Sequence, residues 1–154
     1  MPKIVKLFEV LADDDISWLL SNGVEQQFEP GSTIIREGEF IEFIYLVLEG
    51  LMGVFLSVSG DKQIATISTG EIVGEISYID DQPTSASVIA VEDTLLLAIS
   101  RSALDEKIAF DPLFGVRFYK AIGVSVSQRL RNTLRRMNFI LEQIEQAKHW
   151  RDDL

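Results

Sequence analysis

The spacing of apolar residues changes at Ser100, and this change limits the folds that the chain can adopt. Before Ser100, short apolar segments alternate with glycine-containing turns at intervals of roughly 8–12 residues, which is typical of an antiparallel barrel or sandwich. After Ser100 the spacing is helical, and no helix-breaking residue occurs between Val124 and Lys148. We therefore predict an α+β protein whose β structure precedes a long C-terminal helix.

The turns and caps place the expected elements along the chain. Strands are expected over residues 32–35, 43–48, 51–58, 63–68, 85–91 and 94–100. Two short N-terminal helices are expected over residues 3–11 and 13–21, the second capped by Asp13 and ended by Asn22-Gly23. A further helix over 102–109 follows Ser100 or Ser102 as its cap. The long helix begins at Asp111-Pro112 and would span about 55 Å if straight to residue 148.

Composition excludes several classes of protein. The 154 residues include no Cys and one His, so disulfide scaffolds, thiolate metal sites and Cys nucleophiles are excluded. Because the single histidine, His149, lies near the end of the chain, a His-based triad or metal site is not expected. We therefore predict neither catalytic residues nor a metal site, and no enzyme activity. The N-terminus does not resemble a signal peptide and no apolar run approaches a membrane span, so we expect a cytoplasmic protein without membrane contact.

Charge is distributed unevenly along the chain. Residues 1–110 contain six basic and 19 acidic side chains, whereas residues 111–154 contain eight basic and five acidic ones. The acidic first part would repel a phosphate backbone, so we do not expect nucleic-acid binding. The exception is a group of arginines in the long helix, which either forms a solvated face, pairs with the acidic first part, or contacts an anion or partner: Arg129, Arg131, Arg135 and Arg136.

The long helix contains an apolar seam. Its residues are separated alternately by four and three positions: Leu130, Leu134, Met137, Leu141 and Ile144. This spacing is that of two coiled-coil heptads. The bulky side chains between Phe114 and Ile122 suit packing against the β structure of the same chain. We therefore predict that the later seam is the interface of a parallel homodimer.

Two segments contain a recognisable series of motifs. The first reads FEPGSTIIREGE over residues 28–39 and continues as FIYLVLEG over 43–50. The second reads GEIVGEIS over 70–77 and is followed by DDQPTSASVIA over 80–90. In this order and spacing they closely resemble the cyclic nucleotide-binding domain family, which includes the sensor domains of CRP/FNR regulators, protein kinase A regulatory subunits and cyclic-nucleotide-gated channels. The resemblance implies that the β structure is a jelly-roll barrel.

The resemblance also implies a pocket for a phosphate, a ribose hydroxyl and a base. Gly74 would let the backbone approach the ligand, and a short helix beginning near Glu75 would direct N–H groups at the phosphate. In the family a Glu at this position accepts from the ribose hydroxyl; otherwise Glu75 is a carboxylate favoured by a helix start. Thr133, or the adjacent Asn132, either covers the base or faces solvent. The candidate ligand-binding residues are Gly74, Glu75, Ile76, Ser77, Pro83, Thr84, Ser85, Ala86 and Thr133.

Thr84 is the main departure from the family pattern. The family clamps the phosphate with an Arg inside Pro-Arg-(Ser/Thr)-Ala, and here the pattern reads Pro83-Thr84-Ser85-Ala86. Thr84 and Ser85 can donate hydrogen bonds but provide no charge. A bidentate Arg–phosphate contact is worth close to about 3 kcal/mol, so its loss would weaken binding about 100-fold or more. We also expect the Glu75 carboxylate to face an incoming anion uncompensated, unless a cation from elsewhere reaches the site.

These features predict a non-catalytic regulatory module with a degenerate or weak nucleotide pocket, acting through dimerisation and protein contacts. The alternative is a genuine sensor of cAMP, cGMP or a related cyclic nucleotide, in which the ligand moves the long helix. We expect residues 1–110 to form the sensor domain with its flanking short helices. We expect residues 111–154 to form the dimerisation helix and a short tail, without a DNA-binding domain. The expected partners are a second copy of the chain and a protein that supplies the output; no cofactor is expected beyond the cyclic nucleotide of the alternative.

Overall fold

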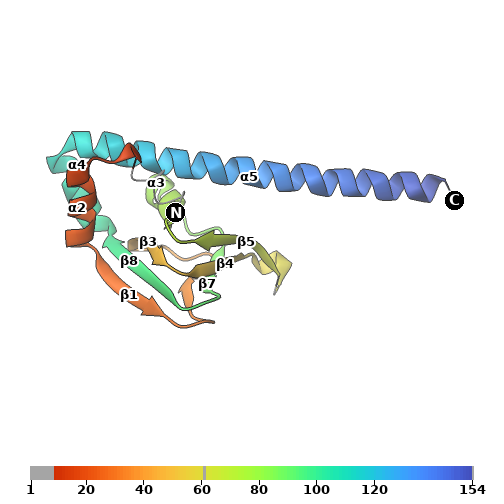
Figure 1. The fold of residues 1–154 in the computed structure, drawn as a ribbon, viewed down its shortest axis with the longest axis horizontal. Coiled ribbons are helices and arrows are strands. Elements are labelled where there is room, and N and C mark those ends of the chain that lie inside the picture. The colour runs from red at the N-terminus through yellow and green to blue at the C-terminus, as the bar shows by residue number, and fades with distance from the viewer. Residues whose placement is uncertain (1–8, 61, 154) are drawn as a thin grey trace.

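The fold is a two-layer β sandwich with helices packed on one of its sheets. A computed structural model describes residues 9–60 and 62–153. The helices gather on one side of the sandwich, and α5 extends far beyond it (Figure 1). The predicted α+β class and jelly-roll arrangement are confirmed. The expected jelly-roll barrel differs in one respect, because the strands form two separate four-stranded sheets that do not close into a barrel.

All strand pairings are antiparallel. One sheet has the order β1-β8-β3-β6 and the other the order β2-β7-β4-β5. The bounds of the strands are β1 Val24–Phe28, β2 Thr33–Ile35, β3 Phe43–Glu49, β4 Leu51–Phe55, β5 Gln63–Ser68, β6 Ile72–Val73, β7 Ser87–Ala90 and β8 Thr94–Ser100. The strands predicted over 63–68 and 94–100 are confirmed to the residue, and the other four predicted strands are present with shifted ends.

Three local features differ from the sequence prediction. β1 was not predicted, because its sequence VEQQF is polar and its residues are mostly exposed; pairing with β8 holds it in the sheet. β6 has only two residues and gives too short a pattern to detect. β4 ends at Phe55 rather than Val58, because the chain turns into a 3-10 helix, η1, over Ser57–Ser59.

The sheet β1-β8-β3-β6 lies between the helices and the other sheet. Its strands β3 and β8 are therefore buried on both faces, which explains their nearly unbroken apolar sequences. In β3, Ile44 and Leu46 face a core formed with the helices, whereas Val47 faces a second core between the two sheets. In β8 the same alternation sends Leu97 to the helical core and Leu96 to the inter-sheet core. Each strand therefore contributes apolar side chains to two cores.

The helices are close to those predicted. Their bounds are α2 Asp13–Asn22, α3 Glu75–Asp80, α4 Arg101–Phe110 and α5 Pro112–Asp152. The helix expected over 3–11 falls mainly on residues outside the described part of the chain. Ser100 caps α4 as expected, since its hydroxyl accepts from the Ala103 N–H at 3.1 Å. The expected cap at Asp13 is wrong: the cap position is Ala12, and its own N–H donates to Asp15 at 2.8 Å.

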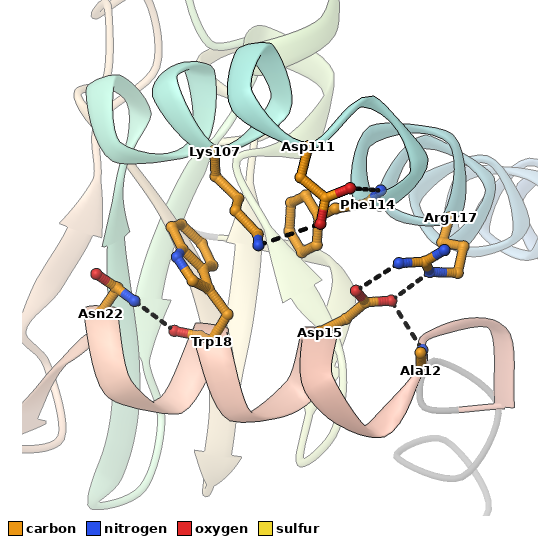
Figure 2. Close-up of polar contacts among 8 residues, drawn as sticks. All are labelled: Ala12, Asp15, Trp18, Asn22, Lys107, Asp111, Phe114 and Arg117. Atoms are coloured by element: carbon orange, nitrogen blue, oxygen red, sulfur yellow. Dashed lines mark hydrogen bonds and ion pairs between the residues drawn. The ribbon is translucent and has the colours of Figure 1, made fainter.

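A buried ion pair joins the N-terminal helix to the long helix. Asp15 is 2% exposed, and it receives hydrogen bonds from Nε and Nη2 of Arg117 at 2.6 and 2.9 Å (Figure 2). At the same corner, Asp111 accepts from the Phe114 N–H and from Lys107. These contacts fix the start of α5 against α2 and α4, and so set the direction in which α5 leaves the sandwich.

Replacing Asp15→Asn is expected to lower the free energy of unfolding by about 2 kcal/mol, because charged hydrogen bonds to Arg117 and Ala12 are weakened. In a chain of this size this corresponds to a fall in Tm of about 6 °C. Arg117 also holds the pKa of Asp15 below its usual value. The wild type should therefore lose this stabilisation as the pH falls through that lowered pKa.

Thermal denaturation followed by circular dichroism, measured at several pH values, tests this prediction. Asp13→Asn is the matched control, because it removes an exposed carboxylate from the same first turn of α2. Equal Tm values for the two variants would show that the buried pair does not stabilise the fold.

The long helix belongs to the core in its first four turns, the last of them through the partly buried Val126. Phe114, Phe118 and Ile122 are buried in the helical core, and Phe114 stacks on Phe118 with ring centroids 5.5 Å apart. From residue 130 to the end of the described chain, every α5 residue is exposed. Despite its 41 residues, α5 lacks the apolar stretch needed to cross a membrane, and this holds for each helix in the described part of the chain.

Candidate functional site

The second glycine of the GEIVGEIS motif joins β6 to α3. Gly74 has φ = +90°, and a Cβ atom there would lie 2.6 Å from the Cδ1 of Ile41 and 3.2 Å from the carbonyl oxygen of Phe43. Only glycine fits this left-handed conformation and close approach without strain. The turn places Glu75 at the start of α3, where its side chain is 1% exposed. The expected short helix beginning near Glu75 is thereby confirmed.

A guanidinium from α5 reaches Glu75. Arg129 donates from Nη1 to Oε1 of Glu75 and from Nη2 to the carbonyl oxygen of Ile72, the first residue of β6. The expectation that Glu75 lacks a compensating cation is therefore wrong, because a residue 54 positions later in the sequence supplies one. The sequence left three alternatives open for the arginine group. For Arg129 the structure shows pairing with the acidic first part of the chain.

Burial and the ion pair act oppositely on Glu75. Burial raises the pKa of the Glu75 carboxyl above its usual value, and the nearby Arg129 guanidinium opposes that rise without cancelling it. Removal from water therefore dominates, as expected for a side chain almost fully enclosed by protein. Arg129 is the nearby cation that opposes this effect of burial on Glu75.

The Thr84 hydroxyl is engaged by the turn that precedes β3. It donates to the carbonyl oxygen of Arg36 at 2.5 Å and accepts from the Glu39 N–H at 3.2 Å. The Thr84 backbone adds two hydrogen bonds to the same turn, with Gly38 and Glu39. At 8% exposed, Thr84 is a buried anchor for residues 36–39. Its hydroxyl hydrogen already has an acceptor in the protein, so it is not free to donate to a ligand.

The remaining candidate pocket residues lie in different surroundings. Ser77 is buried within α3, whereas Ile76, Pro83 and Ser85 are exposed and Ala86 is half-buried. Within the described residues, the Ser85 hydroxyl makes no hydrogen bond. Thr133 is exposed on α5, and its hydroxyl donates to the Arg129 carbonyl oxygen one turn earlier, at 2.9 Å. Among the candidate residues, Ser85 thus offers an exposed neutral donor, whereas Glu75 and Thr84 have partners within the protein.

A second anchor of α3 was not predicted from the sequence. Arg101, the first residue of α4, donates to the carbonyl oxygens of Ser77 and Tyr78, and pairs with Asp81 just after α3. Tyr78 donates its hydroxyl hydrogen to Asp105 at 2.8 Å. Burial raises the Tyr78 pKa, and this hydrogen bond raises it further. A cation is favoured near the C-terminal end of a helix such as α3. Arg101 is about 20 residues away from that end in the sequence, so only the fold brings the two together.

The apolar seam of α5 is exposed in the part of the chain that the structure describes. Its five residues are 46% to 57% exposed: Leu130, Leu134, Met137, Leu141 and Ile144. Arg129 and Arg136, which contact the sandwich, are each offset by one position from the seam residues Leu130 and Met137. One position is a rotation of about 100° around a helix. The seam therefore lies about a quarter turn around α5 from the side that contacts its own β sandwich.

Comparison with known proteins identifies the family to which this fold belongs. The family model described as "Cyclic nucleotide-binding domain" matches residues 25–110, more than half of the chain. The chain belongs to the cyclic nucleotide-binding domain family. The match covers both sheets together with α3 and α4, and it includes the Gly74–Glu75 turn and Thr84. The resemblance inferred from the sequence motifs is confirmed.

Similar curated proteins come from bacteria and eukaryotes. The cyclic AMP receptor protein of Thermus thermophilus is 35% identical over 97 residues, which cover 62% of this chain and 45% of that protein. A cGMP-dependent protein kinase of Eimeria tenella is 33% identical over 101 residues, or 66% of this chain and 10% of the kinase. The chain thus spans less than half the length of these curated relatives.

Solved structures agree on the fold. A cyclic nucleotide-binding domain from Methylobacillus flagellatus KT superposes with a TM-score of 0.77 at 24% identity, covering 86% of this chain and 81% of that one. The catabolite activator protein of Thermus thermophilus gives a TM-score of 0.70 at 29% identity, covering 88% of this chain and 62% of that one. These coverages exceed that of the family match, so the likeness extends beyond residues 25–110.

Proposed function

We propose that this protein is a non-catalytic regulatory module whose nucleotide pocket is degenerate, and which acts through dimerisation and protein contacts. The observation that supports this most directly is the state of Thr84 and Glu75. Thr84 provides no charge where the family pattern has an arginine, and its hydroxyl holds the 36–39 turn. Glu75, which would accept from a ribose hydroxyl, is paired with Arg129.

The exposed seam supports the dimer in this proposal. The five seam residues lie on one side of α5 and are about half exposed, and their spacing suits a second helix of the same kind. Gly123 lies one heptad before Leu130, and a Cβ atom there would meet nothing within 4 Å. Glycine inside a helix costs about 1 kcal/mol relative to alanine. A close approach by a partner helix would account for it, so we propose a parallel homodimer through α5.

A thermal-shift series with the wild-type protein tests the pocket. We expect cAMP, cGMP and cyclic dinucleotides at about 1 mM to leave the Tm unchanged, because a degenerate pocket does not bind them. A ligand that did bind, at about 100 times its Kd, would add about 2.7 kcal/mol to the free energy of unfolding. In a chain of this size such a gain corresponds to a rise of about 5–10 °C. A rise of that size with any of these compounds would contradict the degenerate pocket.

A second candidate function is a genuine cyclic nucleotide sensor. It is favoured by the intact Gly74 turn and by the exposed, free hydroxyl of Ser85 beside Thr84. Arg129 also brings a positive charge to Glu75 in the candidate pocket. The names of several relatives refer to cyclic AMP or cyclic GMP. The same thermal-shift series separates the two candidates, because only the sensor would be stabilised by a ligand.

A further inference from the structure

The junction between α2 and β1 places an asparagine directly before a glycine. Asn22 is the last residue of α2, and Gly23 alone separates it from β1. Asn22 is exposed to water, and Gly23 has no side chain to shield its backbone nitrogen. That nitrogen can attack the side-chain carbonyl carbon of Asn22, which is the first step of asparagine deamidation. The other two asparagines, Asn132 and Asn138, precede a threonine and a phenylalanine, whose side chains crowd the corresponding nitrogen.

Packing requires a glycine at position 23. A Cβ atom there would lie 2.6 Å from Cγ and Cδ1 of Leu97 and 3.0 Å from the carbonyl oxygen of Leu19. Leu97 is 1% exposed within the helical core, so it has little room to move. A bulkier residue at position 23, which would slow the attack, cannot be accommodated without disturbing this core. The reactive Asn-Gly sequence is thus a consequence of how closely the junction approaches β8.

The folded chain holds the same junction in an unreactive geometry. The Gly23 N–H donates to the carbonyl oxygen of Leu19 at 2.9 Å, and Nδ2 of Asn22 donates to the carbonyl oxygen of Trp18 at 2.9 Å (Figure 2). The attacking nitrogen can lose its proton, and the side chain can turn toward it, only after both hydrogen bonds break. Leu19 is 3% exposed and Val24 pairs with β8, so both flanks of the junction are fixed.

We propose that Asn22 is a modification site, which converts to aspartate or isoaspartate without an enzyme at a rate set by how often α2 leaves its docked position. The Gly23 nitrogen loses its proton to solvent base, and its electron pair forms a bond to Cγ of Asn22. The bond from Cγ to Nδ2 breaks, and Nδ2 leaves as ammonia after taking a proton from water. Water then adds to one carbonyl carbon of the resulting cyclic imide and opens the ring. Water is the only co-reactant, and nothing is oxidised or reduced.

The product weakens the corner that directs α5. A carboxylate at position 22 cannot donate to Trp18, and it adds negative charge at the C-terminal end of α2, whose last turn contains no basic residue. An isoaspartyl residue also lengthens the main chain by one atom beside Leu97, where there is no room. The same helix carries Asp15, whose pair with Arg117 fixes the start of α5 (Figure 2). Conversion of Asn22 therefore loosens this corner irreversibly.

Peptide mass spectrometry after incubation in heavy-oxygen water measures the conversion. The wild-type chain is incubated folded, and in parallel in guanidinium chloride, at mildly alkaline pH, and is digested in mild acid so that no conversion occurs during digestion. We expect the Asn22 peptide to take up the heavy isotope about tenfold or more slowly in the folded chain, because reaction then requires locally opened molecules. Asn132 and Asn138 should take up little in either state. Equal rates in the folded and denatured chain, or equal uptake at all three asparagines, would overturn the inference.

Arg117→Gln tests whether the docking of α2 controls the reaction. This variant leaves the junction untouched but breaks the ion pair between α2 and α5, so conversion in the folded chain should accelerate about fivefold or more. Arg117→Lys, which keeps the charge, should react at an intermediate rate. Lys120→Gln is the matched control, because it removes an exposed cation less than one turn away on α5, and it should react like the wild type. A wild-type rate in an Arg117→Gln variant whose Tm has fallen would contradict control by α2.

Two variants of Asn22 itself separate the reaction from its consequence. Asn22→Asp reproduces the charge of the aspartyl product, and its Tm should lie about 2–4 °C below that of the wild type. Asn22→Gln keeps an amide on a longer side chain, so it should retain the Tm and take up no heavy isotope at this position. Equal Tm values for the three proteins would show that the modification does not weaken the corner.

Discussion

The double substitution Leu134→Glu with Leu141→Glu is expected to convert a dimer into a monomer. Each leucine is about half exposed in the single chain, so most of its remaining surface would be buried only by a partner helix. Burying a leucine contributes about 1.5–3 kcal/mol, and four leucines are affected in each dimer. Because each leucine is already about half buried in the single chain, about half of this is lost at each position, which raises the dimer Kd by about 10²–10⁴-fold. Glutamates facing one another add repulsion.

Light scattering coupled to size exclusion gives the mass needed for this test. Phe139→Glu with Gln143→Glu is the matched control, because it adds the same charge and removes an exposed apolar side chain outside the seam. The control should remain dimeric. A wild type that is already monomeric, or a double variant whose mass equals that of the wild-type dimer, would eliminate the seam as the interface. The fold of the sandwich should be unaffected, since both leucines lie beyond the buried turns of α5.

A Thr84→Arg substitution is expected to raise the affinity for cAMP by about 100-fold or more. A bidentate contact between guanidinium and phosphate is worth close to about 3 kcal/mol, and each 1.4 kcal/mol is about tenfold in Kd. The variant loses the hydroxyl contacts to Arg36 and Glu39, so part of the gain is offset by a less stable turn. Isothermal titration calorimetry with cAMP and with cGMP measures the net effect.

The matched control for this variant is Thr84→Gln, which removes the same hydroxyl and adds a long neutral side chain. If the arginine acts through its charge, Thr84→Gln should bind no better than the wild type. An inert but folded Thr84→Arg variant would mean that Thr84 is not the reason that the pocket fails to bind.

Much of the fold follows from local patterns. The turn residues and the alternation of apolar side chains predict most strands, and the motif series alone is enough to identify the family. Where the local signal is weak, prediction fails: β1 is polar, and only its pairing with β8 makes it a strand. The cap expected at Asp13 is wrong because three aspartates follow one another and their sequence does not distinguish them. Asp15 accepts from the N–H of the cap residue Ala12 and is buried against Arg117.

The candidate site can be predicted only in part. Gly74, Glu75 and Thr84 stand out because they occupy fixed places in a motif, and the structure confirms the turn and short helix that position the first two. The partner of Glu75 does not stand out. Arg129 is one of four arginines in an evenly basic segment, and nothing in its sequence surroundings distinguishes it from Arg131 or Arg135.

The sequence by itself determined the order of the elements, the turn that places Glu75, the absence of an arginine at position 84 and the seam along α5. Each of these depends on residues that are neighbours along the chain or that recur with a helix or strand period. Only the tertiary structure decided that Arg129 rather than Arg131 meets Glu75, and that Thr84 is bound to the 36–39 turn. Such contacts depend on how α5 crosses the sandwich and on the separation of the two sheets, and these are set by packing among residues that are distant in sequence.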